Sequence, residues 1–136
     1  MGAFLSASDD HKDRIVPVVR HFYDMGFSIT ATRGTAARLR DRGIPVETIQ
    51  KVSEGRPHVV DRIKNGDIQI IINTSVGRKS SRDAYHIRRG ALVYNILYTT
   101  TLSGARALSE AVMALKRKGW GVNPLQDYHR VSAGEE

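Results

Sequence analysis

The sequence contains no cysteine and only four prolines among its 136 residues. Without cysteine the chain can form neither disulfide bonds nor thiolate metal sites, and a reducing compartment is compatible with it. Scarce proline together with an apolar fraction of 40% is typical of a globular domain rather than a disordered tail. This length suits one domain, so we expect a single domain over residues 1–136, with 130–136 as a mobile tail.

Long apolar runs are missing as well. No run approaches the ~20 residues that a membrane-spanning helix needs. The first residues also lack the charged and apolar pattern of a secretory signal peptide. We therefore expect a cytoplasmic protein with no membrane partner.

Several catalytic and metal-binding motifs are absent. The histidines lack metal-ligand spacing such as H-E-x-x-H, and no G-x-S-x-G nucleophile motif occurs. No pair of carboxylates lies in an apolar setting that would suit acid–base catalysis. Surface or packing roles are the better interpretation for all five histidines: His11, His21, His58, His86 and His129.

The charge is unbalanced, with 21 Lys and Arg against 14 Asp and Glu, a net charge of +7. Such a balance favours anionic partners, namely nucleic acid, a membrane surface or phosphorylated small molecules, but it also suits a solvated surface. Only the charge supports nucleic acid, because no recognition motif or aromatic platform is present. For one basic cluster we favour a solvated helix face over an acidic partner: Arg78, Lys79, Arg82, Arg88 and Arg89.

Short β-rich segments alternate with amphipathic segments along the chain. The predicted strands are 4–6, 27–31, 46–49, 68–72 and 96–99. The predicted helices are 8–25, one after Thr35 that ends at Gly43, one from Pro57 to Gly66, 80–94 and 102–118. Five strands alternating with five helices predict an α/β fold, a Rossmann-like three-layer sandwich whose mainly parallel sheet has helices on both faces.

The first predicted helix shows how these ranges are chosen. Ser8 can cap its start and Gly26 suits the position after its end. Pro17 lies inside the range, so the helix is either kinked there or begins later. Its apolar residues recur at helical spacing: Ile15, Val18, Val19 and Phe22.

Polar residues follow the predicted strands. In parallel sheets, ligands bind beyond the carboxyl ends of the strands, at a switch in strand order. The residues at these ends are hydroxyls, an amide and an ammonium, which suit an anionic ligand that carries a sugar: Ser6, Thr32–Thr35, Lys51, Asn73–Ser75 and Thr99–Thr101.

Each of these groups has a functional and a local interpretation. Gly34 would let the backbone approach a phosphate at a helix start, but Thr35 could simply cap that helix. Lys12 opposes the dipole in the first turn of its helix, which a bound phosphate would compensate, but Lys12 and Lys51 could also be solvated. Asn73, with Thr74 and Ser75 after it, could bind a ribose or base, or could serve only the turn.

One stretch is more specific. KVSEGRPHVVDRIKNGDIQIIINTSVGR, residues 51–78, resembles the core of the methylglyoxal-synthase-like domain that closes the large chain of bacterial carbamoyl-phosphate synthetases. Four further segments carry the same resemblance, so that it covers Phe4 to about His129: LSASDDHK (5–12), ATRGTA (31–36), IRRGAL (87–92) and YTTTLSGA (98–105).

The resemblance implies a regulatory domain that binds allosteric nucleotides. In this family UMP inhibits and IMP activates through one shared site, and ornithine activates from an adjacent site. The resemblance assigns phosphate contacts to Lys12, Thr32, Thr35 and Lys51. It assigns ribose or base positions to Ser6, Asn73, Thr74 and Ser75, the last of which is threonine in related domains. Thr100 matches an ornithine contact whose other ligands would lie outside this chain.

The resemblance also implies what the domain does not do alone. The parent ligase uses ATP with Mg or Mn, whereas this domain would need no cofactor and would not be an enzyme by itself. Its expected partners are the remaining domains of the large chain and the glutaminase small chain, with no nucleic acid.

Two related activities remain as alternatives. Methylglyoxal synthases share the fold and act on dihydroxyacetone phosphate through an aspartate base, but Pro57 stands at the matching position. The histidine expected ahead of Asp83 is replaced by Ser80. A domain of this shape also occurs in the purine enzyme with inosine monophosphate cyclohydrolase activity, but that resemblance is confined to the LSASD and GT segments.

Overall fold

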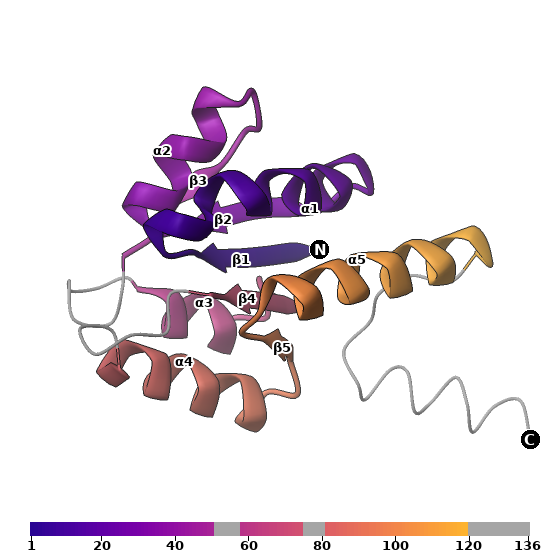
Figure 1. Ribbon diagram of the computed structural model, residues 1–136. Helices are drawn as coiled ribbons and strands as arrows, with labels where there is room; N and C mark the ends of the chain where they lie inside the picture. The colour runs from indigo at the N-terminus through magenta and orange to yellow at the C-terminus, as the bar shows by residue number, and fades with distance from the viewer. Residues whose placement is uncertain (51–57, 75–80, 120–136) are drawn as a thin grey trace, which may run out of the picture.

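The computed structural model describes residues 1–50, 58–74 and 81–119, without the side chains of 81–84. Strands and helices alternate along the chain (Figure 1). The strands are β1 (Gly2–Ser6), β2 (Ser28–Ala31), β3 (Glu47–Thr48), β4 (Ile70–Asn73) and β5 (Leu97–Thr99). The helices are the short 3-10 helix η1 (Asp9–His11), α1 (Lys12–Asp24), α2 (Arg33–Asp41), α3 (Val59–Lys64), α4 (Ser81–Val93) and α5 (Leu102–Arg117).

The five strands form one parallel sheet in the order β3-β2-β1-β4-β5. From β1 the chain builds outward through β2 to β3, then crosses back to place β4 and β5 on the other side of β1. Strand order therefore reverses between β1 and β4, where Ser6 is in register with Asn73. The predicted parallel α/β sheet is confirmed, and the reversal leaves room for a ligand at the carboxyl ends of these two strands.

The central strands β1 and β4 are buried on both faces of the sheet. Along β1, Ala3 and Leu5 belong to the apolar cluster formed with α1, α2 and α5, whereas Phe4 belongs to the cluster formed with α3 and α4. The alternation follows from the two-residue repeat of a strand. Figure 1 shows α1 and α5 on one side of the sheet and α3 and α4 on the other. Within the described residues, no helix is long and apolar enough to cross a membrane.

The predicted first helix is largely confirmed, with two corrections. Its four predicted apolar residues are all buried, and Gly26 has the positive φ of +96° that a helix stop favours. The α-helix begins at Lys12 rather than Ser8, because η1 forms the preceding turn. The Ser8 side chain makes no capping hydrogen bond, and α1 continues through Pro17.

Two further predictions need correction. The second helix begins at Arg33, with Thr32 as its N-terminal cap residue, and not after Thr35. The third strand is reduced to Glu47–Thr48 at the edge of the sheet, where both side chains are exposed. The predicted start of a helix at Pro57 and the predicted tail at 130–136 lie outside the described residues.

Candidate functional site

The predicted polar residues of β1 and β4 lie together at the carboxyl edge of the sheet. Ser6 and Asn73 are neighbours in register, and the Thr74 amide donates to the Ser6 carbonyl at 2.8 Å. All three residues are buried. Among the described residues the Thr74 hydroxyl has no hydrogen-bond partner, although Thr74 is only 4% exposed. A buried hydroxyl of this kind is costly unless something binds it, which suits a ligand position.

The β1–α1 and β2–α2 connections are joined by hydrogen bonds. The Thr32 amide donates to the Leu5 carbonyl at 3.2 Å. The Ala7 amide donates to Oγ1 of Thr35 at 3.1 Å, and this hydroxyl lies 3.5 Å from the Ala7 carbonyl. The Thr32 hydroxyl donates to Oγ1 of Thr35 at 3.4 Å. Thr35 is therefore already engaged in holding the two connections together.

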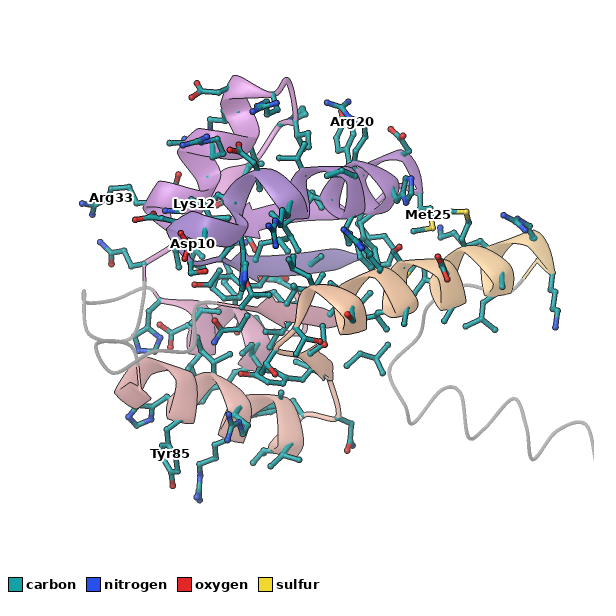
Figure 2. The ribbon with its side chains drawn as sticks, in the orientation of Figure 1. Asp10, Lys12, Arg20, Met25, Arg33 and Tyr85 are labelled. Atoms are coloured by element: carbon teal, nitrogen blue, oxygen red, sulfur yellow. The ribbon has the colours of Figure 1, made fainter. Side chains whose placement is uncertain are left out.

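Lys12 brings a positive charge to the same place. It is the first residue of α1, and its side chain is 16% exposed. A methyl group added at Gly34 would lie 2.9 Å from Lys12 Nζ, so the ammonium lies directly over the first turn of α2. Figure 2 shows Lys12 on α1 toward the end of the molecule where Arg33 of α2 also lies. A side chain at position 34 would require the ammonium to shift.

The start of α2 supplies donors for an anion. The first bond within this helix runs from the Ala36 amide to the Thr32 carbonyl at 2.8 Å. The Gly34 and Thr35 amides, which precede Ala36 in the first turn, therefore have no carbonyl partner inside the helix. Together with the helix dipole, such amides favour a phosphate or carboxylate.

The charge of Lys12 is met by Asp9. The Lys12 ammonium donates a hydrogen bond to the carboxylate of Asp9, the first residue of η1. That hydrogen bond and the positive charge of Lys12 hold the pKa of the Asp9 carboxyl below its usual value of 3.8. Asp9 is not among the site residues predicted from the sequence. The i,i+3 spacing of Asp9 and Lys12 was the only signal that could have indicated the pair.

The structure tests the remaining predicted site residues unevenly. Lys51 and Ser75 lie outside the described residues, as do Pro57 and Ser80, which bear on the methylglyoxal synthase alternative. Thr100 is half-buried and directly follows β5, at the same edge of the sheet as Ser6 and Asn73.

Other candidate features contribute little to the site. Of the basic cluster, the described side chains are Arg88 and Arg89, which are exposed on α4. The described part of the chain holds no group of three His, Cys, Asp or Glu residues placed to bind a metal ion.

The chain is similar in sequence to known proteins. A family model described as "MGS-like domain" matches residues 14–100. The "carbamoyl phosphate synthase large chain, C-terminal section" of Methanopyrus kandleri is 46% identical over 129 residues, covering 94% of this chain and 24% of the relative. The large chain of Xanthomonas axonopodis pv. citri is also 46% identical over 129 residues, which are 12% of its length.

A solved structure is similar in fold. The crystal structure of methylglyoxal synthase from Elizabethkingia anophelis has a TM-score of 0.63 and 20% sequence identity, covering 79% of this chain and 76% of that one. The chain thus spans a quarter or less of the two curated relatives, while it matches most of a protein that shares its fold.

Proposed function

Because this chain belongs to the MGS-like domain family, we propose that it is a regulatory module that binds a nucleotide through its phosphate. The similarity to the C-terminal section of carbamoyl phosphate synthase large chains supports a place in that ligase. In this proposal UMP acts as inhibitor or IMP as activator at one site. The module makes no carbamoyl phosphate itself, and the ATP chemistry with Mg or Mn belongs to the rest of the large chain.

The observation that carries the proposal is the position of Lys12 over the first turn of α2. An ammonium and the first-turn amides of Gly34 and Thr35 converge there, and both kinds of group favour a phosphate. The neighbouring strand β4 ends at the buried residue Asn73. Next comes Thr74, whose buried hydroxyl has no hydrogen-bond partner within the described part of the chain. In the proposed complex the phosphate binds at Lys12, Thr32, Thr35 and Lys51, and the ribose and base bind near Ser6, Asn73, Thr74 and Ser75.

Thr35 takes a defined part in this proposal. Because its hydroxyl bridges to Ala7, it shapes the phosphate site as well as facing it. Thr100 is proposed to contact ornithine at the edge of the module, with the other ornithine ligands supplied by the rest of the large chain. The remaining domains and the glutaminase small chain are the proposed protein partners.

Calorimetric titration with UMP and IMP tests the proposal, with uridine and inorganic phosphate as controls. We expect saturable binding of a nucleotide and weaker or no binding of uridine, because uridine lacks the phosphate. Lys12→Met and Lys51→Ala should each weaken nucleotide binding by roughly 1–3 kcal/mol, the cost of losing a charge-assisted contact. Equal affinity for UMP and uridine would contradict a phosphate-anchored site.

The structural likeness to a methylglyoxal synthase supports one other candidate function, that of a phosphate-binding enzyme acting on dihydroxyacetone phosphate. Pro57 and Ser80 stand where that chemistry requires an aspartate and a histidine, which makes it the weaker candidate. Methylglyoxal formed on adding dihydroxyacetone phosphate to the purified protein would favour the enzyme over the regulatory module.

A further inference from the structure

We infer that Asp9 competes with the ligand for the anion site. Its carboxylate pairs with the Lys12 ammonium in the free protein and is exchanged for the phosphate of the ligand. This inference rests on the proposed nucleotide site and adds a residue that lowers the affinity of that site.

The ammonium of Lys12 lies in an electrostatically unfavourable position. Lys12 is the first residue of α1 and its ammonium lies over the first turn of α2, so it is close to the positive ends of two helices. A cation there is unfavourable unless an anion lies beside it. In the free protein that anion is the carboxylate of Asp9.

The side chains of Lys12 and Asp9 differ in their exposure to solvent. The Lys12 side chain is only 16% exposed, whereas the Asp9 side chain is 93% exposed. Lys12 is therefore held at the site while Asp9 reaches it from the solvent side. An exposed carboxylate can leave without opening any packed contact, which makes the exchange inexpensive.

Asp9 and a ligand phosphate would both bind the Lys12 ammonium. In the proposed complex a ligand phosphate binds beside this ammonium, over the first turn of α2. An ammonium has three donors, but a phosphate bound beside Asp9 would bring two anions together at one cation. Their repulsion favours release of the carboxylate of Asp9, the first residue of η1, from Lys12.

Asp10 supplies a matched control. It lies next to Asp9 in the same 3-10 turn, carries the same charge and is exposed. Figure 2 labels Asp10 beside Lys12, yet the two residues form no hydrogen bond or ion pair in the described part of the chain. Replacing either carboxylate by an amide removes one negative charge from η1, but only Asp9→Asn removes the competitor.

The experiment measures UMP and inorganic phosphate affinity for the wild type, Asp9→Asn and Asp10→Asn, each also in the Lys12→Met background. Breaking an exposed ion pair is a small effect, so we expect Asp9→Asn to tighten binding about two- to five-fold. Asp10→Asn should tighten it less, and the excess effect of Asp9→Asn should vanish when Lys12 is methionine. Circular dichroism confirms that every variant is folded.

The outcomes separate the inference from the proposed function. Nucleotide binding that is equal in Asp9→Asn and Asp10→Asn, or weaker in Asp9→Asn than in the wild type, overturns the competitor and leaves the nucleotide site standing. Failure of the wild type to bind UMP or IMP overturns the proposed function. In that case phosphate binding that tightens only in Asp9→Asn still supports the exchange of Asp9 for an anion. If neither the wild type nor Asp9→Asn binds phosphate, both the competitor and the nucleotide site are overturned.

Discussion

The hydroxyl of Thr35 lies where the β1–α1 and β2–α2 connections meet, and both of its backbone partners belong to Ala7. Valine has nearly the same shape as threonine but would leave the buried Ala7 amide without an acceptor. We expect Thr35→Val to lower the free energy of unfolding by about 1–3 kcal/mol, measured by urea denaturation. Thr35→Ser keeps the hydroxyl and should recover most of this loss.

The exposed residue Thr48 is the control for this substitution. Its hydroxyl accepts from Arg40 Nη2 at 2.8 Å at the surface, so Thr48→Val should change stability by no more than about 0.5 kcal/mol. If both valine variants unfold at the same urea concentration, the bonds of Thr35 to Ala7 do not stabilise the fold.

The pairing of Asp9 with Lys12 should make the stability of the fold depend on pH. The pKa of Asp9 is lowered first by the hydrogen bond from Lys12 and then by the charge of that residue. Since the folded pKa lies below the unfolded one, the pair stabilises the fold above the ordinary carboxyl range and stops doing so as the pH falls through the folded value. An NMR titration should find the Asp9 midpoint below 3.8, and Lys12→Met should raise it. An unchanged midpoint in Lys12→Met would exclude Lys12 as the cause.

The site residues differ in how far the sequence could predict them. The positions of Lys12 and Thr32 could be predicted, because both lie in a connection from a strand to a helix at the carboxyl edge of the sheet, where parallel sheets bind ligands. The partner of Thr35 could not, since Ala7 is 28 residues away and nothing in its side chain indicates a role. For Asp9 the sequence held one signal, the i,i+3 spacing from Lys12, which Asp10 does not share.

At the scale of the helix and strand, ends that depend on a glycine were predicted well. The glycines that follow α1, α2, α3 and α5 have positive φ and no side chain to oppose it: Gly26, Gly43, Gly66 and Gly119. After α4 the residue with positive φ is Asn95. Helix starts were predicted less well. Thr32 and Thr35 are the same residue type three positions apart, so composition alone could not decide which of them precedes the first turn of α2.

A long-range contact between α1 and α5 fixes the last helix. Lys116 Nζ donates to the Met25 carbonyl at 2.8 Å, at the end of α1, and lies 5.9 Å from the centre of the Phe27 ring. Lys116→Met keeps the aliphatic length but removes both polar contacts. We expect it to lower the free energy of unfolding by about 1 kcal/mol, measured by chemical denaturation.

Lys118 is the matched control, because it is exposed just beyond the end of α5. Lys118→Met should change stability by no more than about 0.5 kcal/mol. An equal loss in the two variants would mean that net charge, and not the contact with α1, explains the effect.

For the molecule as a whole, β1 links the two apolar clusters. Leu5 packs with α1, α2 and α5, and its neighbour Phe4 packs with α3 and α4. Neither helical layer has a sheet of its own, so each is stable only while β1 remains in place between β2 and β4. The proposed site spans the same strands, and its geometry therefore depends on both layers.

Phe4→Ala tests this dependence. Phe4 is fully buried, and its truncation should cost about 3–5 kcal/mol by leaving a cavity beside α3 and α4. If the layers unfold as one unit, hydrogen exchange in α1 should accelerate by the same factor as in α3, although Phe4 belongs to the α3 side. Leu97→Ala, at an exposed position of the edge strand β5, should leave both rates nearly unchanged. Faster exchange in α3 alone would show instead that the two faces of the sheet unfold independently.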